Sequence, residues 1–428
     1  MMANPPFNVD KVDAEFIKTD RRLPFGLSGV NKDKHVSNGN YRWISYFHSY
    51  LSPIGRAGFV MSSQASSAGH GEKEVRRKLV GTGDVDVMVA FRSNFFYTRT
   101  VPCELWHFDR SKPPARKGRV LMLDARHVYR KVTRKIYGFS PEQQANLAAI
   151  VWLYRGQQER FLGLVQSYIT RLAAEAAAVD TALRAFEATL TASHTALAAF
   201  VDSAKRVAAL PQDKRQALMD ATAEWAGAAN VSAADRATLL TGLGAFCKSV
   251  ARPVQTNQAQ HTARHTFDPL AESARGRVKQ IDLLYKLAAG AAQLAQELAA
   301  SDEAAEFFDR RAIGKLTRPL DEERKSAVEQ LKDCAYLHRQ ILWLQDRFPQ
   351  AEMADVPGLC KVVTRSDIEA ADWSLTPGRF VGVAPAEVDD DFDFEQTLRD
   401  MHIELADLNL ESVDLALRIQ SNFEELGA

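Results

Sequence analysis

The spacing of apolar and polar positions divides the chain into a mixed part and a helical part. Up to about residue 140, short apolar runs alternate with amphipathic segments, which is typical of strands and helices in turn. Apolar residues at helical spacing predict a helix over 41–51, ended by Ser52-Pro53 and Gly55. A charged helix is predicted over 72–81. The strand candidates are 57–61, 85–91, 101–108 and 120–123.

This order of elements is expected for the second half of an open α/β sheet. In such sheets a nucleotide-type ligand binds at the carboxyl ends of the early strands, usually over a glycine-rich turn. No strand with such a turn precedes Asn4. The later Gly26-Leu27-Ser28-Gly29 has no apolar strand before it, so we reject it as a phosphate or cofactor loop.

Helical spacing dominates after residue 140. Ser140 as N-cap, Pro141 at the first helical position and Gln143 three residues on form a predicted capping box. Apolar residues then recur at helical spacing over 161–197 and again over 321–348. Breaks are predicted at Pro211, at Gly242 to Gly244 and at Pro253, and an exposed loop is predicted over 256–266.

The C-terminal segment changes character again. Residues 373–382 are dense in turn formers, and the acidic run 389–391 follows them. Apolar positions from Phe394 to Phe423 predict a final amphipathic helix or helix pair. Such a helix either packs on its own domain or binds a partner, and both interpretations stay open.

Charge is balanced overall but unevenly distributed. The chain has 54 basic and 54 acidic residues and is 46% hydrophobic, as is ordinary for a globular protein. Residues 110–135 nevertheless carry a net charge of +9, and residues 387–428 a net charge of −11. A basic block beside an acidic tail fits a protein that meets a polyanion with one part, although two solvated faces would show the same pattern.

Several classes of protein are disfavoured by the sequence. The four cysteines are scattered without a CxxC pair or neighbouring histidines, so neither a disulfide framework nor a zinc site is predicted. His261 and His265 have i, i+4 spacing but no third ligand. The N-terminus lacks the pattern of a signal peptide, and no apolar run is long enough for a membrane span. We therefore expect a cytoplasmic protein without a membrane segment.

The segment Asn4-Pro5-Pro6-Phe7 carries the clearest candidate chemistry. The amine of an aromatic base is a poor nucleophile because its lone pair is delocalised into the ring. Two acceptors aimed at its N–H groups would free the lone pair. The Asn4 side-chain carbonyl and the Pro5 backbone carbonyl supply two acceptors, while the prolines fix their angles and offer no competing N–H. Phe7 would stack on the base.

A base within duplex DNA must be flipped out of the stack to reach such a site, and a basic surface must hold the backbone. The basic block is the candidate for that surface. The residues assigned to DNA binding are Arg110, Lys112, Arg116, Lys117, Arg119, Arg130 and Lys131.

The order of several sequence blocks resembles the modification subunit of type I restriction-modification systems. The blocks are ANPPFNV near the start, GNYRWI at 39–44, LSPIGRAG at 51–58, EVRRKLV at 74–80, FYTRTVP at 96–102, VLMLDAR at 120–126 and LTPGRFVG at 375–382. The resemblance covers residues 3 to about 155 and about 335 to 428, whereas the helical middle matches loosely and resembles an insertion.

The resemblance implies an adenine-N6 DNA methyltransferase that uses S-adenosylmethionine and assembles with a specificity subunit and a restriction subunit. It assigns the catalytic motif to Asn4, Pro5, Pro6 and Phe7, and contact with the specificity subunit to the C-terminal helices. Family members carry a helical domain and a glycine-rich cofactor motif before the catalytic motif. We therefore expect a truncated chain in which most of the cofactor site is missing and its residues are unknown.

The expected fold is α/β plus all-α, namely the C-terminal half of a Rossmann-like methyltransferase sheet followed by a long helical region. The expected domains are 1–139 for the partial catalytic domain, 140–350 for the helical insertion and 351–428 for subunit assembly. The alternative is a non-catalytic remnant or split half that only assembles with the specificity subunit. Methylation of an RNA base or a protein glutamine would use the same acceptor geometry, but the later blocks disfavour it.

Overall fold

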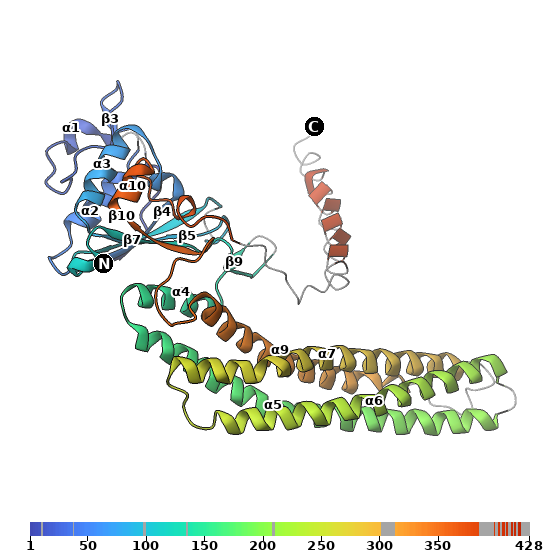
Figure 1. The fold of residues 1–428 in the computed structure, drawn as a ribbon. Helices are drawn as coiled ribbons and strands as arrows, with labels where there is room; N and C mark the ends of the chain where they lie inside the picture. The colour runs from blue at the N-terminus through green and yellow to red at the C-terminus, as the bar shows by residue number, and fades with distance from the viewer. Residues whose placement is uncertain are drawn as a thin grey trace. The chain divides into compact units, whose positions relative to one another are not determined.

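The computed structural model forms two compact units, Met1–Gly382 and Val383–Ala428. It describes residues 1–9, 12–36, 38–96, 100–133, 136–207, 210–300 and 313–384, and beyond these only groups of one to three residues between 398 and 420. The first unit contains a mixed sheet and a set of long helices (Figure 1). The expected combination of an α/β part with an all-α part is therefore confirmed.

The main sheet has six strands in the order β1-β4-β6-β5-β7-β10. The strands are β1 (Met2–Ala3), β4 (Arg56–Ser62), β5 (Val85–Ala90), β6 (Cys103–Asp109), β7 (Arg119–Asp124) and β10 (Cys360–Thr364). β1 pairs with β4, and β5 with β7, in parallel, whereas β6 and β10 run antiparallel to their neighbours. The strands β1, β4, β5 and β7 thus all end at one edge of the sheet.

Each face of the sheet packs on a different set of helices. One face carries Trp106 and Phe108 and belongs to a core with α2 (Asn40–Ser49), α3 (His70–Gly81) and α10 (Arg365–Ala370). The other face carries Val87 and Leu121, whose core continues through α4 (Pro141–Tyr154) into the long helices. Opposite faces differ because successive side chains of a strand point to opposite sides.

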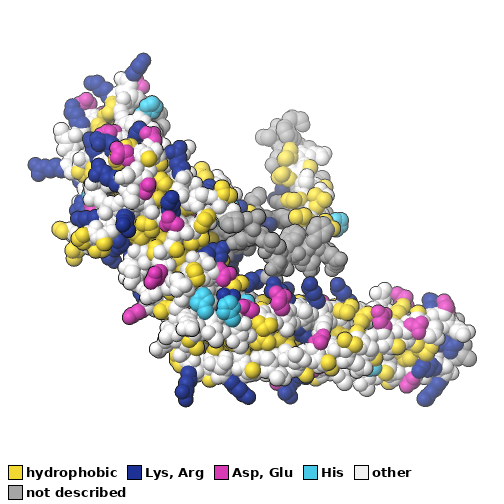
Figure 2. Space-filling model, in the orientation of Figure 1, with side chains coloured by type: hydrophobic (Ala, Val, Ile, Leu, Met, Phe, Trp, Pro, Cys, Tyr) yellow, Lys and Arg dark blue, Asp and Glu magenta, His cyan; other side chains and the backbone are white. Residues whose placement is uncertain are grey.

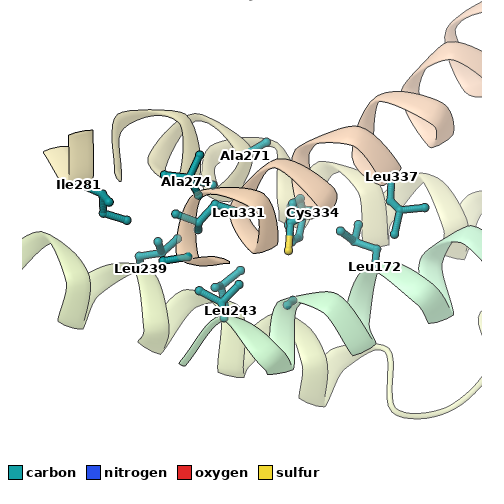
Figure 3. Close-up of a cluster of buried hydrophobic side chains, with 14 of the residues drawn as sticks. Leu172, Leu239, Leu243, Ala271, Ala274, Ile281, Leu331, Cys334 and Leu337 are labelled. Atoms are coloured by element: carbon teal, nitrogen blue, oxygen red, sulfur yellow. The ribbon is translucent and has the colours of Figure 1, made fainter. Parts of the chain in front are cut away.

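Four long helices form a bundle. They are α5 (Gln158–Arg206), α6 (Gln212–Ser249), α7 (Asn257–Ala299) and α9 (Thr317–Arg347). Small and branched apolar side chains from all four meet in its interior, among them Leu172, Leu243, Ala271 and Leu331 (Figure 3). The bundle stands between β7 and β10 in the sequence, so the chain leaves the sheet at β7 and returns to pair with the same strand.

The remaining described elements are short. They are β2 (Val12–Asp13), α1 (Ala14–Ile17), β3 (His35–Val36), the 3₁₀ turns η1 (Ser63–Ser66), η2 (Pro114–Arg116) and η3 (Pro377–Arg379), β8 (Arg130–Lys131) and β9 (Tyr137–Gly138). The predicted capping box at the start of α4 is confirmed, with the Ser140 hydroxyl accepting from the Gln143 backbone N–H.

Two predictions about the helical region are wrong. Residues 257–266 are the first turns of α7, not a loop. Gln260 in this segment is buried and donates to the Leu162 carbonyl of α5 and to the Val254 carbonyl, so this polar side chain makes contacts inside the protein. Gly242 and Gly244 lie inside α6. A Cβ at Gly242 would collide with the Leu270 side chain of α7, so this glycine permits close helix packing.

The C-terminal part differs from the expected division at residue 351. Residues 360–364 add β10 to the sheet, and the Leu375 backbone N–H donates to the Ser66 carbonyl. Of the segment 351–428 that was predicted to serve assembly, residues 351–382 belong to the first unit and Val383–Ala428 form the second. Its described residues include exposed apolar side chains at helical spacing, namely Leu398, Met401, Leu405, Leu408, Val413, Leu415 and Ile419. The acidic run 389–391 lies outside the described residues.

The described residues were compared with the expectations of no membrane span, no disulfide and no metal site. Among them, none of the helices has the length and apolar character that a membrane crossing needs. The four cysteines are free thiols. The described part of the chain contains no group of three His, Cys, Asp or Glu residues placed to hold a metal ion. His261 lies on α7 and contacts the Pro349 carbonyl.

Candidate functional site

The Asn4-Pro5-Pro6-Phe7 motif begins at the end of β1, which is fixed to β4. The Met1 ammonium donates to the Arg56 carbonyl over 2.8 Å, and the Gly58 N–H donates to the Met1 carbonyl over 3.0 Å. Ala3 lies opposite Phe59 in the parallel pair. The motif therefore starts at the carboxyl edge of the sheet from a hydrogen-bonded strand.

A pair of asparagines fixes the other end of the motif. Asn8 has a φ of 53°, in the left-handed region that asparagine tolerates better than most residues. Its N–H donates to Asn40 Oδ1 over 2.9 Å, and Asn40 Nδ2 donates back to Asn8 Oδ1 over 2.8 Å. Asn40 is buried at the start of α2. The four-residue motif is thus held between β1 and α2.

The motif residues differ in exposure. Asn4 and Pro6 are exposed, Pro5 is buried and Phe7 is half-buried. Buried Pro5 fixes its own φ near −65° and has no N–H, so its carbonyl direction is restricted by the ring and by packing. An exposed Asn4 amide beside a fixed Pro5 carbonyl is the arrangement that the predicted chemistry needs.

A pocket lies at the same edge, between the carboxyl ends of β4 and β5 and the start of β6. Its volume is about 250 Å³, many times the space of about 10–15 Å³ that one water needs. The lining residues are Ser63, Gln64, Ser67, Ala90, Phe91, Pro102, Cys103, Glu104, Arg126, Thr376 and Gly378. Buried residues such as Cys103 and Glu104 form the floor, whereas Gln64, Ser67 and Arg126 are exposed at the mouth.

Glu104 is the central polar group of this floor. The residue is 1% exposed, and its Oε2 has no hydrogen-bond partner. Burial raises the pKa of the Glu104 carboxyl to about 8, and the nearby Asp124 charge adds to this shift. The Ser66 hydroxyl and the Arg126 and Arg76 guanidinium groups oppose the shift. At neutral pH, Glu104 is therefore mainly a neutral acid.

An ion pair forms one wall of the pocket. The Arg126 guanidinium donates to Asp124 at the end of β7, with Nε to Oδ1 at 2.8 Å. A Cβ on Gly378 would lie 2.6 Å from Arg126 Nη2, so a larger residue in η3 would displace the end of the Arg126 side chain. Thr376 of the same turn shares a 2.7 Å hydrogen bond with Ser66. The predicted LTPGRFVG block thus completes the pocket.

A buried network supports the turn η1 from below. Arg76 on α3 is 1% exposed and donates to the Trp373 carbonyl and, over 2.9 Å, to the Tyr41 hydroxyl. Tyr41 Oη in turn donates to the Ala65 carbonyl of η1. Burial raises the pKa of Tyr41, which keeps its hydroxyl protonated as a donor. These bonds fix η1, which carries Ser63 and Gln64 at the pocket.

The basic block does not lie on the surface as a whole. Lys112 is buried, and its ammonium donates to the Val85 and Arg119 carbonyls, so it offers no surface to a phosphate. Burial lowers the pKa of Lys112 to about 8. The assignment of Lys112 to DNA binding is therefore wrong. Its charge instead faces the buried Asp86 carboxylate at 3.8 Å.

Arg116 and Arg110 are also engaged within the protein. Arg116 Nη1 donates to Asp86 Oδ1 over 2.8 Å, and Arg110 Nε lies 3.6 Å from Asp84 Oδ2. Burial favours a higher pKa for Asp86, but hydrogen bonds from His107 and Arg155 and the Lys112 charge hold that pKa below its usual range. Three of the seven assigned basic side chains are therefore engaged within the protein, next to the sheet.

The exposed members of the assignment are Lys117, Arg119, Arg130 and Lys131. Arg130 and Lys131 form β8, which pairs with β9 in a separate two-stranded ribbon. Arg134 and Lys135 lie outside the described residues. Figure 2 shows basic side chains dispersed among acidic and apolar ones on the face drawn. The exposed part of the block is thus a smaller basic surface than the sequence predicts.

Comparison with known proteins gives matches to the N-terminal part of the chain, which contains the Asn4-Pro5-Pro6-Phe7 motif and most of the sheet. Residues 1–167 match the family model described as N-6 DNA methylase. The matched region contains Asn4 to Phe7, the strands β1 to β7 and the start of the bundle.

Curated relatives match the same part. The methylase subunit of the type I restriction enzyme MjaIX from Methanocaldococcus jannaschii is 38% identical over 136 residues, covering 32% of this chain and 24% of the relative. The HindI methylase subunit from Haemophilus influenzae is 29% identical over 149 residues, covering 35% of this chain and 32% of the relative. The chain thus spans less than a third of each of these relatives.

Solved structures of similar proteins were also found. The type I methyltransferase subunit from Streptococcus thermophilus has a TM-score of 0.31 and 18% identity, with 36% of this chain and 31% of that chain covered. The EcoKI M protein has a TM-score of 0.23 and 16% identity, with 34% and 29% covered.

N-6 DNA methylases imply S-adenosylmethionine as methyl donor, and the pocket allows a test of fit. Sites for drug-sized ligands occupy about 300–1,000 Å³, whereas this pocket has about 250 Å³. Glu104 Oε2 at the floor has no hydrogen-bond partner, so it could bond to a polar atom of a ring that enters the pocket. The pocket is therefore large enough for one ring of the donor, and it opens to solvent at Gln64, Ser67 and Arg126.

The pocket residues were missed by sequence reasoning. One signal was available: Glu104 is a charged residue within the apolar strand segment 101–108. A charged residue in a strand of a buried sheet is unusual, because charged side chains are rarely buried. A buried acid is therefore a candidate for a functional group. Thr376 and Gly378 lie more than 270 positions further along the chain, so no local pattern connects them with Glu104.

Proposed function

We propose that this chain acts as a modification subunit of the type I kind and methylates adenine N6 in DNA. The observation that carries the proposal is the Asn4-Pro5-Pro6-Phe7 motif, held at both ends at the carboxyl edge of the sheet. The match of residues 1–167 to the N-6 DNA methylase family model supports the same chemistry.

The proposed reaction uses hydrogen-bond acceptors rather than a strong base. The Asn4 side-chain carbonyl and the Pro5 backbone carbonyl accept the two N–H groups of the target amine, which turns the nitrogen lone pair out of the ring system. Phe7 stacks on the base. S-adenosylmethionine, when bound, supplies the methyl group as an electrophilic sulfonium. After transfer the nitrogen carries an extra proton, which it loses to solvent.

The proposed partners follow from the relatives. They are DNA, a specificity subunit that reads its sequence and a restriction subunit, and the proposed location is the cytoplasm. Free thiols agree with a reducing compartment. The exposed basic residues Lys117, Arg119, Arg130 and Lys131 are proposed to contact phosphates, and the apolar face of the second unit is proposed to contact the specificity subunit.

The second candidate function is assembly without catalysis. The exposed apolar positions of the second unit, from Leu398 to Ile419, favour it because they offer a helical face for another subunit. In that case the motif would have no role in methylation, and only the helical surfaces would be needed.

One experiment separates the two candidates. Asn4→Ala is introduced at the chromosomal locus, and N6-methyladenine is mapped across the genome by single-molecule sequencing. The control is Asn230→Ala, which removes an exposed asparagine of α6. We expect Asn4→Ala to remove methylation at one sequence motif at least 100-fold, as loss of a charge-stabilising group typically does, while the control keeps it.

Methylation that persists in Asn4→Ala cells would contradict the catalytic proposal. Capture of the specificity subunit by both variants, with unchanged genomic methylation, would favour the assembly function instead.

A further inference from the structure

The β8–β9 ribbon carries a surface tyrosine that is held in a fixed orientation. The Arg92 guanidinium lies over the Tyr129 ring at 4.0 Å and over the Tyr137 ring at 3.6 Å. A cation in this position is attracted by the negative face of the ring. The two tyrosine rings also meet edge to face, with their centroids 5.1 Å apart. Tyr129 is therefore an ordered ring, although it is 37% exposed.

The ribbon is fixed to the sheet at its base. The Tyr137 backbone N–H donates to the Asn94 carbonyl over 3.1 Å, in the loop that follows β5. The Gln143 side-chain amide donates to the Tyr129 carbonyl over 3.0 Å. Phenylalanine rings from the two segments pack together there, namely Phe91, Phe95 and Phe139. The position of the Tyr129 ring is thus set by the sheet.

The surface around Tyr129 is basic. Segments 92–102 and 125–139 contain seven Arg or Lys residues and no Asp or Glu. Arg130 and Lys131 directly follow Tyr129 and are exposed. Aromatic rings stack on bases and cations contact phosphates, so this combination is typical of a surface that binds an unpaired base of a nucleic acid.

The strand order relates Tyr129 to the Asn4-Pro5-Pro6-Phe7 motif. β7, which leads into the ribbon, is four strands from β1, or about 19 Å at a strand spacing of about 4.8 Å. Both strands end at the same edge of the sheet. A two-stranded ribbon also fits the major groove of DNA, which is about 12 Å wide. A duplex that lies along this edge can present one nucleotide to Asn4 and a groove to the ribbon.

The proposed reaction leaves a ligand for such a ring. A target base that turns out of the duplex leaves its partner base unpaired and a gap in the stack. Side chains that enter between bases can hold a duplex in such a distorted state. Because the target of the proposed function is adenine, the base that stays behind is thymine.

We propose that Tyr129 stacks on the thymine that stays in the duplex when the target adenine turns out toward Asn4. The proposal rests on the proposed function, because this thymine is unpaired only if an adenine is flipped. Tyr129 is a positioning residue, since it holds the opened duplex while Asn4 and Pro5 contact the target amine. Arg92 and Tyr137 fix the ring for this contact.

Photocrosslinking to the full-length chain tests the contact without a substitution. The probe is a 25-mer duplex in which an abasic site lies opposite 5-iodouracil, a thymine analogue that bonds covalently to a stacked aromatic ring under ultraviolet light. The reference duplex has adenine opposite the 5-iodouracil. We expect mass spectrometry to locate an adduct at Tyr129 with the probe, and a much smaller yield with the reference.

Affinities measure what the ring contributes. Fluorescein-labelled duplexes carry thymine opposite either an abasic site or adenine, and anisotropy gives the affinity for each. We expect the wild type to bind the abasic duplex at least about fivefold more tightly, since removing one stacked aromatic ring typically weakens binding by about that factor or more. Tyr129→Phe keeps the preference. Tyr129→Ala lowers it about fivefold or more, while its affinity for the paired duplex stays within about twofold of the wild type.

The matched control is Tyr50→Ala. Tyr50 is 58% exposed and follows α2, shortly before the start of β4. The start of β4 lies at the opposite edge of the sheet from the ribbon. We expect this variant to keep both the adduct at Tyr129 and the preference for the abasic duplex.

The inference is overturned if no adduct forms, if the adduct forms at other residues, or if Tyr129→Ala prefers the abasic duplex as the wild type does. The crosslink needs no variant, so the test stays valid if Tyr129→Ala does not fold. The genomic methylation assay with Asn4→Ala has a separate readout. Methylation lost in Asn4→Ala cells, with an unchanged preference in Tyr129→Ala, would contradict the stacking contact and leave the proposed function intact.

Discussion

At the scale of single residues, Glu104 is an ionisable side chain in a strand position whose neighbours on the same face are apolar and buried. Trp106 and Phe108 follow it on the same face of β6 and are fully buried. An apolar residue at 104 would continue that core and remove an unsatisfied oxygen. An acid there costs stability, and strongly perturbed acids of this kind concentrate at functional sites.

The pH dependence of stability measures that cost. The pKa of Glu104 is about 8 in the folded chain and near its ordinary value of 4.5 in the unfolded chain. Between these values the unfolded state loses its proton first, so Glu104 lowers the free energy of unfolding as pH rises from 4.5 to 8. We expect Glu104→Gln to be more stable than the wild type at pH 8, by more than about 1 kcal/mol, and similar at pH 5.

Urea unfolding at pH 5 and pH 8 checks this expectation. Glu142→Gln should behave in the opposite sense: burial favours a higher pKa for Glu142, but hydrogen bonds from Arg171 and Tyr336 keep that pKa below its ordinary value. A Glu104→Gln variant that follows the wild type at both pH values would show that Glu104 is ionised in the folded protein.

The sequence predicts some of these residues and not others for a physical reason. Asn4 to Phe7 are contiguous, and their chemistry depends on residue types at fixed spacing, so they could be identified before the fold. The pocket depends on distant segments, Ser66, Glu104 and Thr376 among them, which only the sheet brings together. Lys112 was assigned from charge, yet a buried lysine and an exposed one are identical in sequence.

At the scale of elements, the bundle depends on packing rather than on helix propensity. Leu284 of α7 is 3% exposed and belongs to the large core, whereas the adjacent Leu283 is 51% exposed. Consecutive residues of a helix point about 100° apart, so one side chain faces the other helices and the next faces solvent. The pair therefore offers identical chemistry with opposite burial.

Leu284→Ala is expected to lower the free energy of unfolding of the bundle by about 2–5 kcal/mol, through lost burial and the cavity that remains. Leu283→Ala should change it by less than about 0.5 kcal/mol. Hydrogen exchange read by mass spectrometry locates the effect in α5, α6, α7 and α9. Equal effects of the two substitutions would show that α7 does not pack on its partners through the face that contains Leu284.

Helices and strands were largely predictable because their apolar spacing is regular. The strands of the sheet and the start of α4 lie where the patterns indicate. The errors occurred where composition misled. In the polar segment 257–266, Gln260 is buried and bonds to the Leu162 carbonyl of α5. Gly242 lies within α6, where a Cβ would collide with the Leu270 side chain. Neither contact is visible without the neighbouring element.

At the scale of the whole molecule, the charges that remain free determine binding to a polyanion. Arg130 and Lys131 are exposed on β8, whereas Lys112 and Arg116 are engaged with Asp86. Only exposed basic side chains can displace counterions from phosphates. The formal net charge of residues 110–135 thus overstates what this part of the chain offers to DNA.

Replacing Arg130 and Lys131 together by Ala is expected to weaken binding to any duplex sequence and to lower the slope of log affinity against log salt by about one unit for each phosphate contact. Anisotropy titrations from 50 to 200 mM salt give that slope. The control replaces Lys214 and Lys325, which lie on α6 and α9. An unchanged slope in the β8 variant would exclude this ribbon from the DNA surface.

The placement of the bundle between β7 and β10 also has a consequence for synthesis on the ribosome. Leu123 pairs with Cys360, roughly 240 residues later in the chain. At about 5–20 residues per second, translation of the intervening segment takes about 12–50 s. For that time the outer edge of β7 lacks β10, and the pocket lacks the wall that Thr376 and Gly378 provide. A nascent chain therefore presents Asn4 to Phe7 long before it can complete the pocket, so ligand recognition there becomes a property of the finished polypeptide.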